Sequence, residues 1–393
     1  LKTPLRLKCT SRWLPAVRGL RWRKMPDRGN HLATFVVHGV TFQVPANYQL
    51  LEPVSAGPSF LACSAKDHHT GELVQVKKVE DIALDPTAAR RVLQDVRLLR
   101  SLRHENILDL RLVLVPNIIG CLTDMYVVTE ILEADLGTVL KSTQDITDEH
   151  RQFFLYQILR GMKFVHSAGI VHFNLRPWSL LVDSNCDLKI SDFSMAHYCP
   201  HECAQRLPED RVLPSVRYKA PEVLCLTMQF GKPSDVWSIG CIFAELMKRQ
   251  PPFKGQQRTH QLQLVLQGLS QKSEALRTVR RAAEEAELRG AMAAHGAQEA
   301  RQRFVDNFAQ EFRPEARDML SSMLALDSRQ RPTIEALLAH PYLATLHAPD
   351  DEPESPLLDE ADATTGPGGC ASGPEEWAHL RQEILMEVLH YVA

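Results

Sequence analysis

The sequence predicts an α+β fold with two lobes, a small N-terminal lobe rich in β-strands and a larger C-terminal lobe rich in helices. Up to about residue 130, short apolar runs alternate with turn residues, which favours an antiparallel sheet. Beyond Asp135 the apolar residues recur at helical spacing. Because strands precede helices instead of alternating with them, the two kinds of element are expected to form separate lobes.

The composition is that of an ordinary globular protein, with 393 residues, of which 44% are hydrophobic and 24% charged. The net charge of −3 gives no support to bulk electrostatic binding, so no nucleic-acid partner is expected. No stretch approaches the roughly 18 consecutive apolar residues that span a bilayer, and no membrane partner is expected. Nine scattered cysteines without a C-x-x-C pair favour a reduced, intracellular chain.

The predicted first lobe contains one helix among its strands. Val92, Val96 and Leu99 recur at helical spacing and predict a helix over Thr87–Leu102. Runs of strand-forming residues bounded by turn residues predict strands at 34–40, 49–54, 61–65, 73–79, 110–115 and 125–130.

Residues 1–33 are expected to form a basic extension. Nine Lys or Arg residues accompany a single acid, Asp27, among the first 28 positions. An Arg-rich, acid-poor start can indicate an organelle transit peptide, but Pro4 and Pro15 interrupt any helix there. We therefore favour a disordered or non-native extension, with Met25 as a plausible start.

The predicted second lobe begins with a long helix over Glu149–Ala168, for which Asp148 is the expected cap. A second buried helix is predicted over Pro233–Lys248. An Ala-, Glu- and Arg-rich composition predicts a helical insertion at about 256–310. The tail, residues 346–393, is expected to be acidic and poorly ordered at first, and to end in an amphipathic docking helix.

Five short motifs occur in a fixed order along the chain. They are Val76-Lys77 at the end of a strand, His172 after the long helix, Asp192-Phe193, Ala220-Pro221-Glu222, and Asp235-Val236-Trp237-Ser238. Their joint order resembles the protein-kinase signature set. The resemblance implies a kinase domain over residues 42–345, with an N-lobe at 42–130 and a C-lobe at 131–345.

Longer stretches narrow the resemblance to the mitogen-activated protein (MAP) kinases and their stress-activated branch. These stretches are Arg103–Ile107, Tyr156–Gly161, Val236–Cys241, Leu326–Ser328 and Pro349–Pro353. The resemblance implies a monomer in the cytoplasm, and also the nucleus, that uses ATP and Mg²⁺. It also implies partners from MAP kinase pathways, namely upstream kinases, phosphatases and substrates with docking motifs.

The resemblance places the phosphate-binding part of the nucleotide site on the first strands. The glycine-rich loop, normally G-x-G-x-x-G, reads Ser55–Phe60 after Val54 and keeps only Gly57. Lys77 falls at the position that pairs with the α and β phosphates, and Asp95 takes the place of its glutamate partner.

The resemblance also places the adenine site, where two positions differ from the family pattern. Gln75 stands where a small alanine packs on the base, and Ala62 where a valine covers it, so adenine binding is expected to be weaker. The other positions implied to line this site are Thr129, Leu132 and Leu180.

The catalytic loop departs most from the family pattern. The pattern H-R-D-L-K-P-x-N appears as His172–Ser179, so Asn174 stands at the position of the catalytic base. An amide cannot accept the proton of a substrate hydroxyl, and loss of a general base costs about 10²–10⁴-fold in rate. Arg176 replaces the lysine that steadies the transferring phosphate.

Metal binding and activation are implied to be affected as well. Asp192 keeps the principal magnesium carboxylate, but Ser179 replaces the asparagine of the second site. Phe173 removes the arginine that reads a phosphorylated activation segment. The phosphorylation triplet falls on Asp210, Arg211 and Val212, which offer no acceptor, and Asp327 matches one acid of the docking patch.

Three hypotheses remain open from the sequence. The leading one is a catalytically impaired pseudokinase that acts as a signalling scaffold or docking protein. The second is a serine/threonine kinase with residual activity on proline-directed substrates, because Lys77 and Asp192 are retained. The third is a decaying copy of an active gene, suggested by the basic leader and the Ala-rich insertion.

Overall fold

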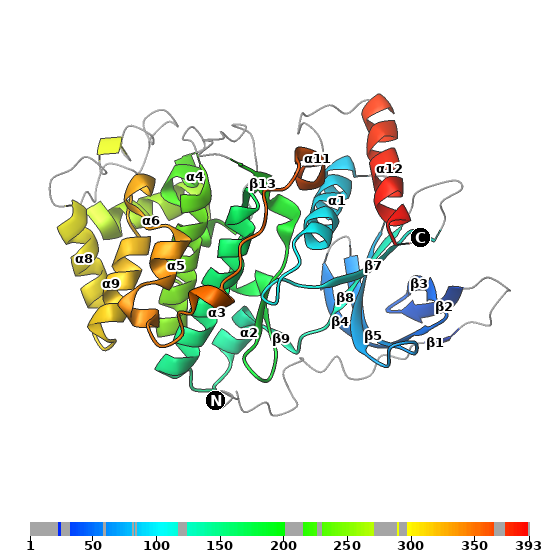
Figure 1. Cartoon of the computed structure of the whole chain (residues 1–393), viewed down its shortest axis with the longest axis horizontal. Coiled ribbons are helices and arrows are strands. Elements are labelled where there is room, and N and C mark those ends of the chain that lie inside the picture. The colour runs from blue at the N-terminus through cyan, green and yellow to red at the C-terminus, as the bar shows by residue number, and fades with distance from the viewer. Residues whose placement is uncertain are drawn as a thin grey trace. The chain divides into compact units, whose positions relative to one another are not determined.

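The computed structural model describes residues 23–24, 32–57, 60–80, 82, 85–116, 124–200, 215–225, 230–270, 289–290, 297–364 and 374–391. They divide into two compact units. The N-lobe unit holds the described residues up to 133, other than 104–106, and those from 359 onward; the C-lobe unit holds 104–106 and 134–358. The first is built on β-strands and the second mainly on helices, which confirms the predicted α+β fold (Figure 1).

The N-lobe unit contains a five-stranded antiparallel sheet in the order β4-β5-β6-β8-β7. Its strands are β4 (Tyr48–Gly57), β5 (Phe60–Asp67), β6 (Leu73–Val79), β7 (Leu110–Leu114) and β8 (Met125–Glu130). Each lies over a run that the sequence predicts as a strand. The alternation of apolar residues therefore locates this sheet well.

A second sheet precedes it, and here the sequence prediction is wrong in detail. Residues 34–40 do not form one strand, because His38 and Gly39 adopt positive φ angles of 53° and 82° and turn the chain into a hairpin. The hairpin strands are β2 (Leu32–Val37) and β3 (Val40–Pro45), and β1 (Arg23–Lys24) pairs with β2. Strand β1 lies inside the extension that was expected to be disordered.

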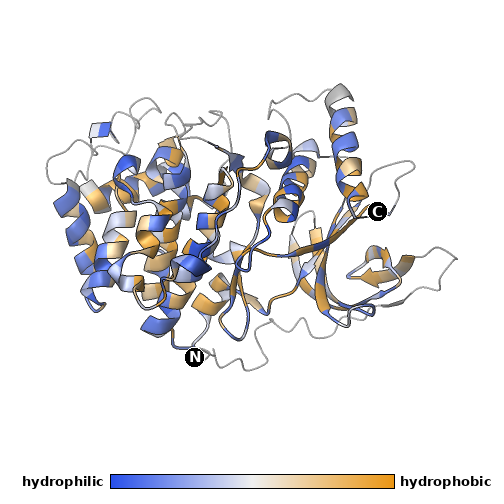
Figure 2. Ribbon diagram, in the orientation of Figure 1, coloured by the Kyte–Doolittle hydropathy of each residue, from blue (hydrophilic) through white to orange (hydrophobic). Residues whose placement is uncertain are grey.

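The two sheets share one hydrophobic core. Phe35, Phe42 and Val44 from the hairpin are buried together with Leu50, Val76 and other residues of the larger sheet. Phe42 and Tyr126 meet edge to face, with 5.9 Å between ring centroids. The Tyr126 hydroxyl also accepts a hydrogen bond from the Gln43 amide at 3.0 Å. The ribbon of this hairpin is largely orange in Figure 2, the colour of hydrophobic residues.

Helix α1 (Pro86–Ser101) joins the chain's last segment to the N-lobe unit. Asp85 caps α1 by accepting hydrogen bonds from the amides of Thr87 and Ala88. Helix α12 (Pro374–Leu389) and the short helix α11 (Glu360–Ala363) pack on α1. Glu387 of α12 bonds Arg100 at 2.6 Å and lies 3.6 Å from Arg97. The amphipathic helix expected at the end of the chain thus lies against α1.

The C-lobe unit is organised around two long, buried helices, α3 (Asp148–Ser167) and α5 (Lys232–Lys248). Around them lie α2 (Leu136–Lys141), α4 (Pro221–Cys225), α6 (Arg258–Ser270), α8 (Ala297–Phe308), α9 (Pro314–Met323) and α10 (Ile334–Leu338). The middle of this unit is largely hydrophobic in Figure 2, whereas α8 is largely hydrophilic. Short strands carry its functional loops: β9 (Ala134–Asp135), β10 (Ile170–Val171), β11 (Leu180–Val182), β12 (Leu188–Ile190) and β13 (His197–Tyr198).

Two expectations for this unit need correction, and a third is only partly covered by the described residues. Helix α3 is capped by Thr147, not Asp148: the Thr147 hydroxyl accepts from the His150 amide, and the His150 ring accepts from the Thr147 amide. The helical insertion is seen as α6 and α8, and residues 271–288 and 291–296 between them lie outside the described part.

The first half of the tail is the second correction, because residues 347–364 have a defined course. Arg160 of α3 bonds the Asp351 carboxylate at 3.1 Å, and Lys163 donates to the Glu352 carbonyl at 2.8 Å. Further on, the Ser355 amide donates to the Ser167 hydroxyl at 2.8 Å. The acids that suggested disorder are held by the basic side of α3.

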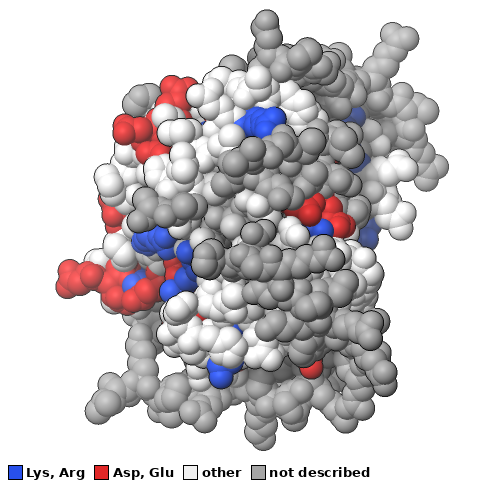
Figure 3. All heavy atoms as spheres, turned by 90° about the vertical axis from the view of Figure 1, so that its right-hand side faces the viewer, with Lys and Arg blue, Asp and Glu red and all other residues white. Residues whose placement is uncertain are grey.

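On the one face in view in Figure 3, the described charged side chains do not gather in a single patch. Figure 3 shows basic and acidic side chains in small separate groups on the face in view, in keeping with a net charge of −3. Within the described residues, none of the helices combines the length and the apolar character needed to cross a bilayer.

Candidate active site

The N-lobe part of the candidate site is one face of the five-stranded sheet. Ala62 pairs with Lys77, and Gln75 pairs with Thr129, on three adjacent strands. Residues two apart on a strand share a face, so these four side chains lie on the same side of the sheet. Ala62 and Thr129 are buried there. The structure therefore brings together four of the residues assigned to the nucleotide site.

Phe60 lies against Gly57 and against Lys77, the lysine that the resemblance assigns to phosphate binding. Its ring lies so close to Gly57 that a Cβ at that glycine would overlap a ring carbon. The Lys77 ammonium lies 4.9 Å from the centre of the same ring, which is within cation–π range. The side chain that replaces a glycine of the motif thus contacts the group that would bind phosphate.

The other assigned N-lobe residues have these positions. Val54 lies on β4, Asp95 on α1, and Leu132 two residues after the end of β8. Leu180 is different, because it belongs to the C-lobe unit, where it opens β11 and is fully buried.

The C-lobe part of the site is built on Asp235, at the start of α5. This fully buried carboxylate accepts hydrogen bonds from the amides of His172 and Phe173, both at 2.8 Å. His166 Nε2 lies 3.0 Å from it. Burial works to raise the pKa of the Asp235 carboxyl, but the bonds from His166 and the loop lower that pKa overall. Asp235 therefore fixes the backbone of the catalytic loop.

The ring of His172 makes hydrogen bonds to the backbone of two neighbouring loops, one of which carries Asn174. Burial lowers the pKa of His172, so its ring is neutral near pH 7. Nδ1 accepts a hydrogen bond from the Asn174 amide at 3.2 Å, which leaves Nε2 to donate to the Ser191 carbonyl at 3.1 Å. The ring thus links the loop carrying Asn174 to the loop carrying Asp192.

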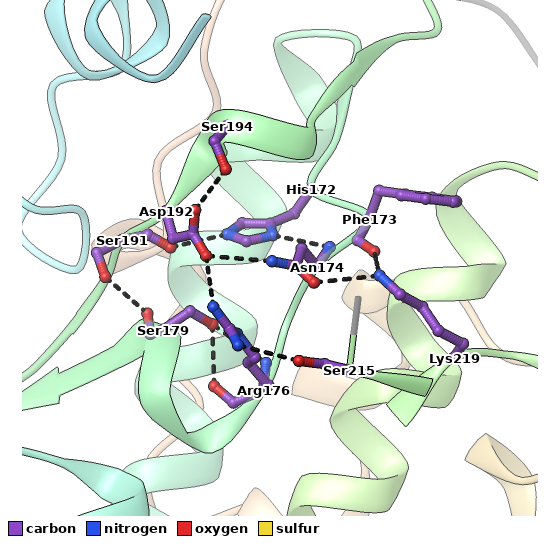
Figure 4. A network of polar contacts seen from close by, with 10 residues as sticks. All are labelled: His172, Phe173, Asn174, Arg176, Ser179, Ser191, Asp192, Ser194, Ser215 and Lys219. Atoms are coloured by element: carbon purple, nitrogen blue, oxygen red, sulfur yellow. Dashed lines mark hydrogen bonds and ion pairs between the residues drawn. The ribbon is translucent and has the colours of Figure 1, made fainter. Parts of the chain in front are cut away.

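Both ends of the Asn174 side chain are bound by neighbours (Figure 4). Its Nδ2 donates to Asp192 Oδ2 at 3.1 Å, and its Oδ1 accepts from the Lys219 ammonium at 3.2 Å. The residue is buried, with 4% of its surface exposed. Asn174 therefore connects a carboxylate to an ammonium, and it offers no group that could take a proton.

The Asp192 carboxylate is held by three protein donors. Oδ2 accepts from Asn174 and from the Arg176 guanidinium at 3.0 Å, while Oδ1 accepts from the Ser194 hydroxyl at 2.6 Å. The Arg176 guanidinium also bonds the Ser215 hydroxyl at 2.9 Å. Asp192 has a left-handed backbone, with φ of 66°. Its oxygens thus face a network of protein donors that includes a cation.

Ser179, assigned to a second metal position, is turned away from Asp192. Its hydroxyl donates to the Arg176 carbonyl at 2.9 Å and accepts from the Arg176 amide at 3.1 Å. Mg²⁺ prefers about six oxygen ligands at 2.0–2.1 Å. In this arrangement the carboxylate oxygens carry donors and the serine oxygen closes a turn, so the residues present do not fit that ion.

Phe173 is the centre of an aromatic cluster that sequence reasoning missed. Its ring lies 4.7 Å from Phe230 and 5.0 Å from His197, measured between centroids. The Lys219 ammonium lies 4.6 Å from its ring centre and donates to its carbonyl. Lys219 immediately precedes the Ala220-Pro221-Glu222 motif, so its position beside a familiar motif was the available signal.

The regulatory residues are only partly described. Asp210, Arg211 and Val212 lie outside the described residues. Asp327 is paired with Arg329, which donates to its two carboxylate oxygens at 3.0 and 2.8 Å. The hydrogen bonds from Arg329 lower the pKa of the Asp327 carboxyl. One acid of the expected docking patch is thus already neutralised by its neighbour.

Comparisons with known proteins agree with this geometry. Residues 48–343 match the protein kinase domain family. The chain is 38% identical over 329 residues to mitogen-activated protein kinase 1 of Oryza sativa subsp. japonica, covering 83% of this chain and 80% of that protein. It is 37% identical over 323 residues to mitogen-activated protein kinase 10 of Arabidopsis thaliana, covering 80% and 78%. The protein therefore belongs to the mitogen-activated protein kinase family.

Proposed function

We propose that this protein is a catalytically impaired MAP kinase, a pseudokinase that works as a signalling scaffold or docking protein. The observation that carries the proposal is the position of Asn174, whose amide bridges Asp192 and Lys219. General-base assistance is worth about 10²–10⁴-fold, and an amide cannot supply it. The proposed role rests on binding by the retained fold.

The nucleotide site supports the same proposal. Phosphoryl transfer depends on positioning and on neutralising phosphate charge. Phe60 contacts the Lys77 ammonium, and the long polar side chain of Gln75 shares the sheet face with Ala62. Protein kinases as a family use ATP and Mg²⁺. In this member we propose that ATP and Mg²⁺ bind weakly or not at all.

We further propose that the catalytic loop does not respond to phosphorylation in the usual way. In an active relative, an arginine at the position of Phe173 would pair with a phosphate on the activation segment. Phe173 instead packs with Phe230 and His197, and Lys219 lies over its ring. Packing among these four side chains would hold the loop in one arrangement without any added charge.

The proposed partners are proteins of MAP kinase pathways: upstream kinases, phosphatases and substrates with docking motifs. We also propose that the protein belongs to the stress-activated branch, that it is a monomer, and that it resides in the cytoplasm and nucleus. The pairing of Asp327 with Arg329 argues for a docking preference shifted away from strongly basic peptides, since one acid of the patch is neutralised.

The alternative function is a serine/threonine kinase with residual activity toward proline-directed substrates. It is favoured by the retention of Lys77 and Asp192 and by the similarity to proteins named as MAP kinases. Thermal unfolding with and without Mg-ATP separates the two. A rise in Tm at millimolar Mg-ATP supports the alternative, whereas an unchanged Tm supports the pseudokinase.

The direct test is transfer of a radiolabelled γ-phosphate to a generic proline-directed substrate. The wild-type chain is expected to give no turnover above that of the Lys77→Ala variant, which serves as the matched control. Turnover by the wild type that Lys77→Ala abolishes would contradict the proposed function.

A further inference from the structure

The cation nearest the Asp192 carboxylate in the catalytic loop is a side chain of the protein itself. Arg176 and Asp192 form an ion pair of 3.0 Å, and each side chain is 30% exposed. Both residues belong to the C-lobe unit, so this geometry does not depend on the N-lobe. Figure 4 shows this guanidinium on the carboxylate to which the family resemblance assigns the principal magnesium ion.

The guanidinium is held in place from two sides. One terminal nitrogen bonds Asp192, while the other bonds the Ser215 hydroxyl at 2.9 Å. Ser215 itself has a left-handed backbone, with φ of 53°. The Ser179 hydroxyl accepts a hydrogen bond from the backbone amide of Arg176 and donates one to the Arg176 carbonyl. Arg176 is thus positioned by its own loop and by the far end of the activation segment.

A divalent ion at Asp192 would meet both a steric and an electrostatic obstacle. It would have to displace the hydrogen bonds from Arg176, Asn174 and Ser194 to reach the carboxylate oxygens. It would also approach a fixed positive charge within a few ångströms, and like charges at that distance repel strongly where water is partly excluded. Arginine keeps its proton at any accessible pH, so this obstacle is permanent.

We propose that Arg176 is a resident cation that replaces the metal ion at Asp192, and that it closes this carboxylate to divalent cations. The Arg176 side chain neutralises the charge of Asp192. It also connects the catalytic loop, which carries Asn174, to the Asp192-Phe193 motif without any cofactor. Removing the guanidinium leaves the Asp192 carboxylate with two neutral donors, Asn174 and Ser194, whose hydrogen bonds a divalent ion can displace without charge repulsion. The proposal implies that a single substitution of Arg176 creates a divalent-cation site at Asp192.

The test measures binding of Mn²⁺ alone to the full chain, by the loss of the free-ion electron paramagnetic resonance signal. Mn²⁺ is chosen because it accepts the same oxygen ligands as Mg²⁺. The wild type is expected to bind no Mn²⁺ that depends on Asp192. Arg176→Ala is expected to gain one site, at least about tenfold tighter than any in the wild type, which corresponds to 1.4 kcal/mol.

Three further variants keep the result interpretable. Arg176→Ala combined with Asp192→Asn should lose the gained site, and Arg176→Gln, which can still donate a hydrogen bond, should open it if Arg176→Ala fails to fold. Arg303→Ala removes one exposed positive charge on α8 and should gain nothing.

The outcomes are separate from those of the kinase assay. Wild-type binding of Mn²⁺ that Asp192→Asn removes would overturn the inference, as would folded Arg176→Ala and Arg176→Gln variants with no gain. Phosphoryl transfer is not part of this readout, so the inference and the proposed function can fail independently.

Discussion

The Lys219 ammonium donates a hydrogen bond to the side-chain oxygen of Asn174 at 3.2 Å. The lysine is buried, with 3% of its surface exposed, so its contact with Asn174 is shielded from solvent. With a carboxylate at position 174 the contact would be an ion pair, and the carboxylate could also accept a proton. With the amide it is a hydrogen bond that orders the loop and accepts no proton.

Replacing Phe60 by glycine should strengthen nucleotide binding. The change removes the ring that lies over Lys77 and close to Gly57. An exposed cation–π contact is worth about 0.5–1 kcal/mol, so we expect an affinity gain of roughly two- to five-fold. Titration with a fluorescent ATP analogue measures it. Phe60→Tyr keeps an aromatic face and should behave as wild type; equal or weaker binding by Phe60→Gly would show that the ring does not obstruct the site.

Truncation of Phe173 should destabilise the fold. Its ring is 2% exposed and packs among Phe230, His197 and Lys219. Phe→Ala changes in a core cost about 3–5 kcal/mol in the free energy of unfolding. Urea denaturation of Phe173→Ala measures this loss, and Phe173→Leu should recover more than half of it. A loss below about 1 kcal/mol would mean that the cluster does not hold the loop.

Stability should fall with acidification in a pH window set by one half-buried and two buried histidines. Burial, followed by the nearby Arg160 charge, lowers the pKa of His104 to about 4. The unfolded chain, with a histidine pKa of about 6.5, takes up the proton first, so the stabilisation present above that pH is lost as the pH falls. His172 and His150, whose pKa values burial also lowers, act in the same direction.

This prediction is checked by urea denaturation at several pH values between about 6.5 and 4. Each such group adds at most about 1.4 kcal/mol per pH unit to the slope. His104→Asn should flatten the slope, since the amide can still accept the bond from the Asn106 amide without titrating. An identical slope in this variant would assign the pH dependence elsewhere.

The last helix should be needed for the stability of the N-lobe unit. Glu387 is 3% exposed and paired with Arg100 at 2.6 Å, and Arg97 lies nearby. Removing Glu387 takes the most buried acid from both arginines, which keep Asp362 and Glu383, so we expect a loss below that of a fully broken buried pair, about 3–5 kcal/mol. Hydrogen exchange of α1 should rise in Glu387→Ala and stay unchanged in Gln382→Ala, which alters an exposed position on the same helix. If the hydrogen exchange of α1 is unchanged in both variants, α12 does not stabilise the N-lobe unit through Glu387.

Periodicity and turn residues were enough to predict the α+β class and most element bounds. The strands carrying Lys77 and Thr129 lie where apolar runs are bounded by turns, because burial of one sheet face imposes that pattern. The cap of α3 was misplaced by one residue, since Thr147 and Asp148 are both good caps by type. Only the geometry of the His150 ring decides between them.

Side-chain partnerships in the site could not be predicted in the same way. Motif order located Asn174 and Asp192, but not the bond between them or the guanidinium of Arg176 on the carboxylate. Those contacts join loops that are distant in the chain. They depend on side-chain rotamers, which the spacing of motifs in the sequence does not specify. The tail was misjudged for a related reason: Asp351 looks solvated in sequence, and only α3 supplies its partner Arg160.

The central claim is that the amide at position 174 prevents phosphoryl transfer, and one comparison tests it most directly. In a chain that also carries Arg176→Lys and Ser179→Asn, the rate of γ-phosphate transfer is measured with and without the Asn174→Asp substitution. We expect at least about a 100-fold higher rate with the carboxylate, because a general base contributes about 10²–10⁴-fold. Transfer by the unmodified chain at the roughly 1–100 s⁻¹ typical of kinases, with little gain from Asn174→Asp, would contradict the account.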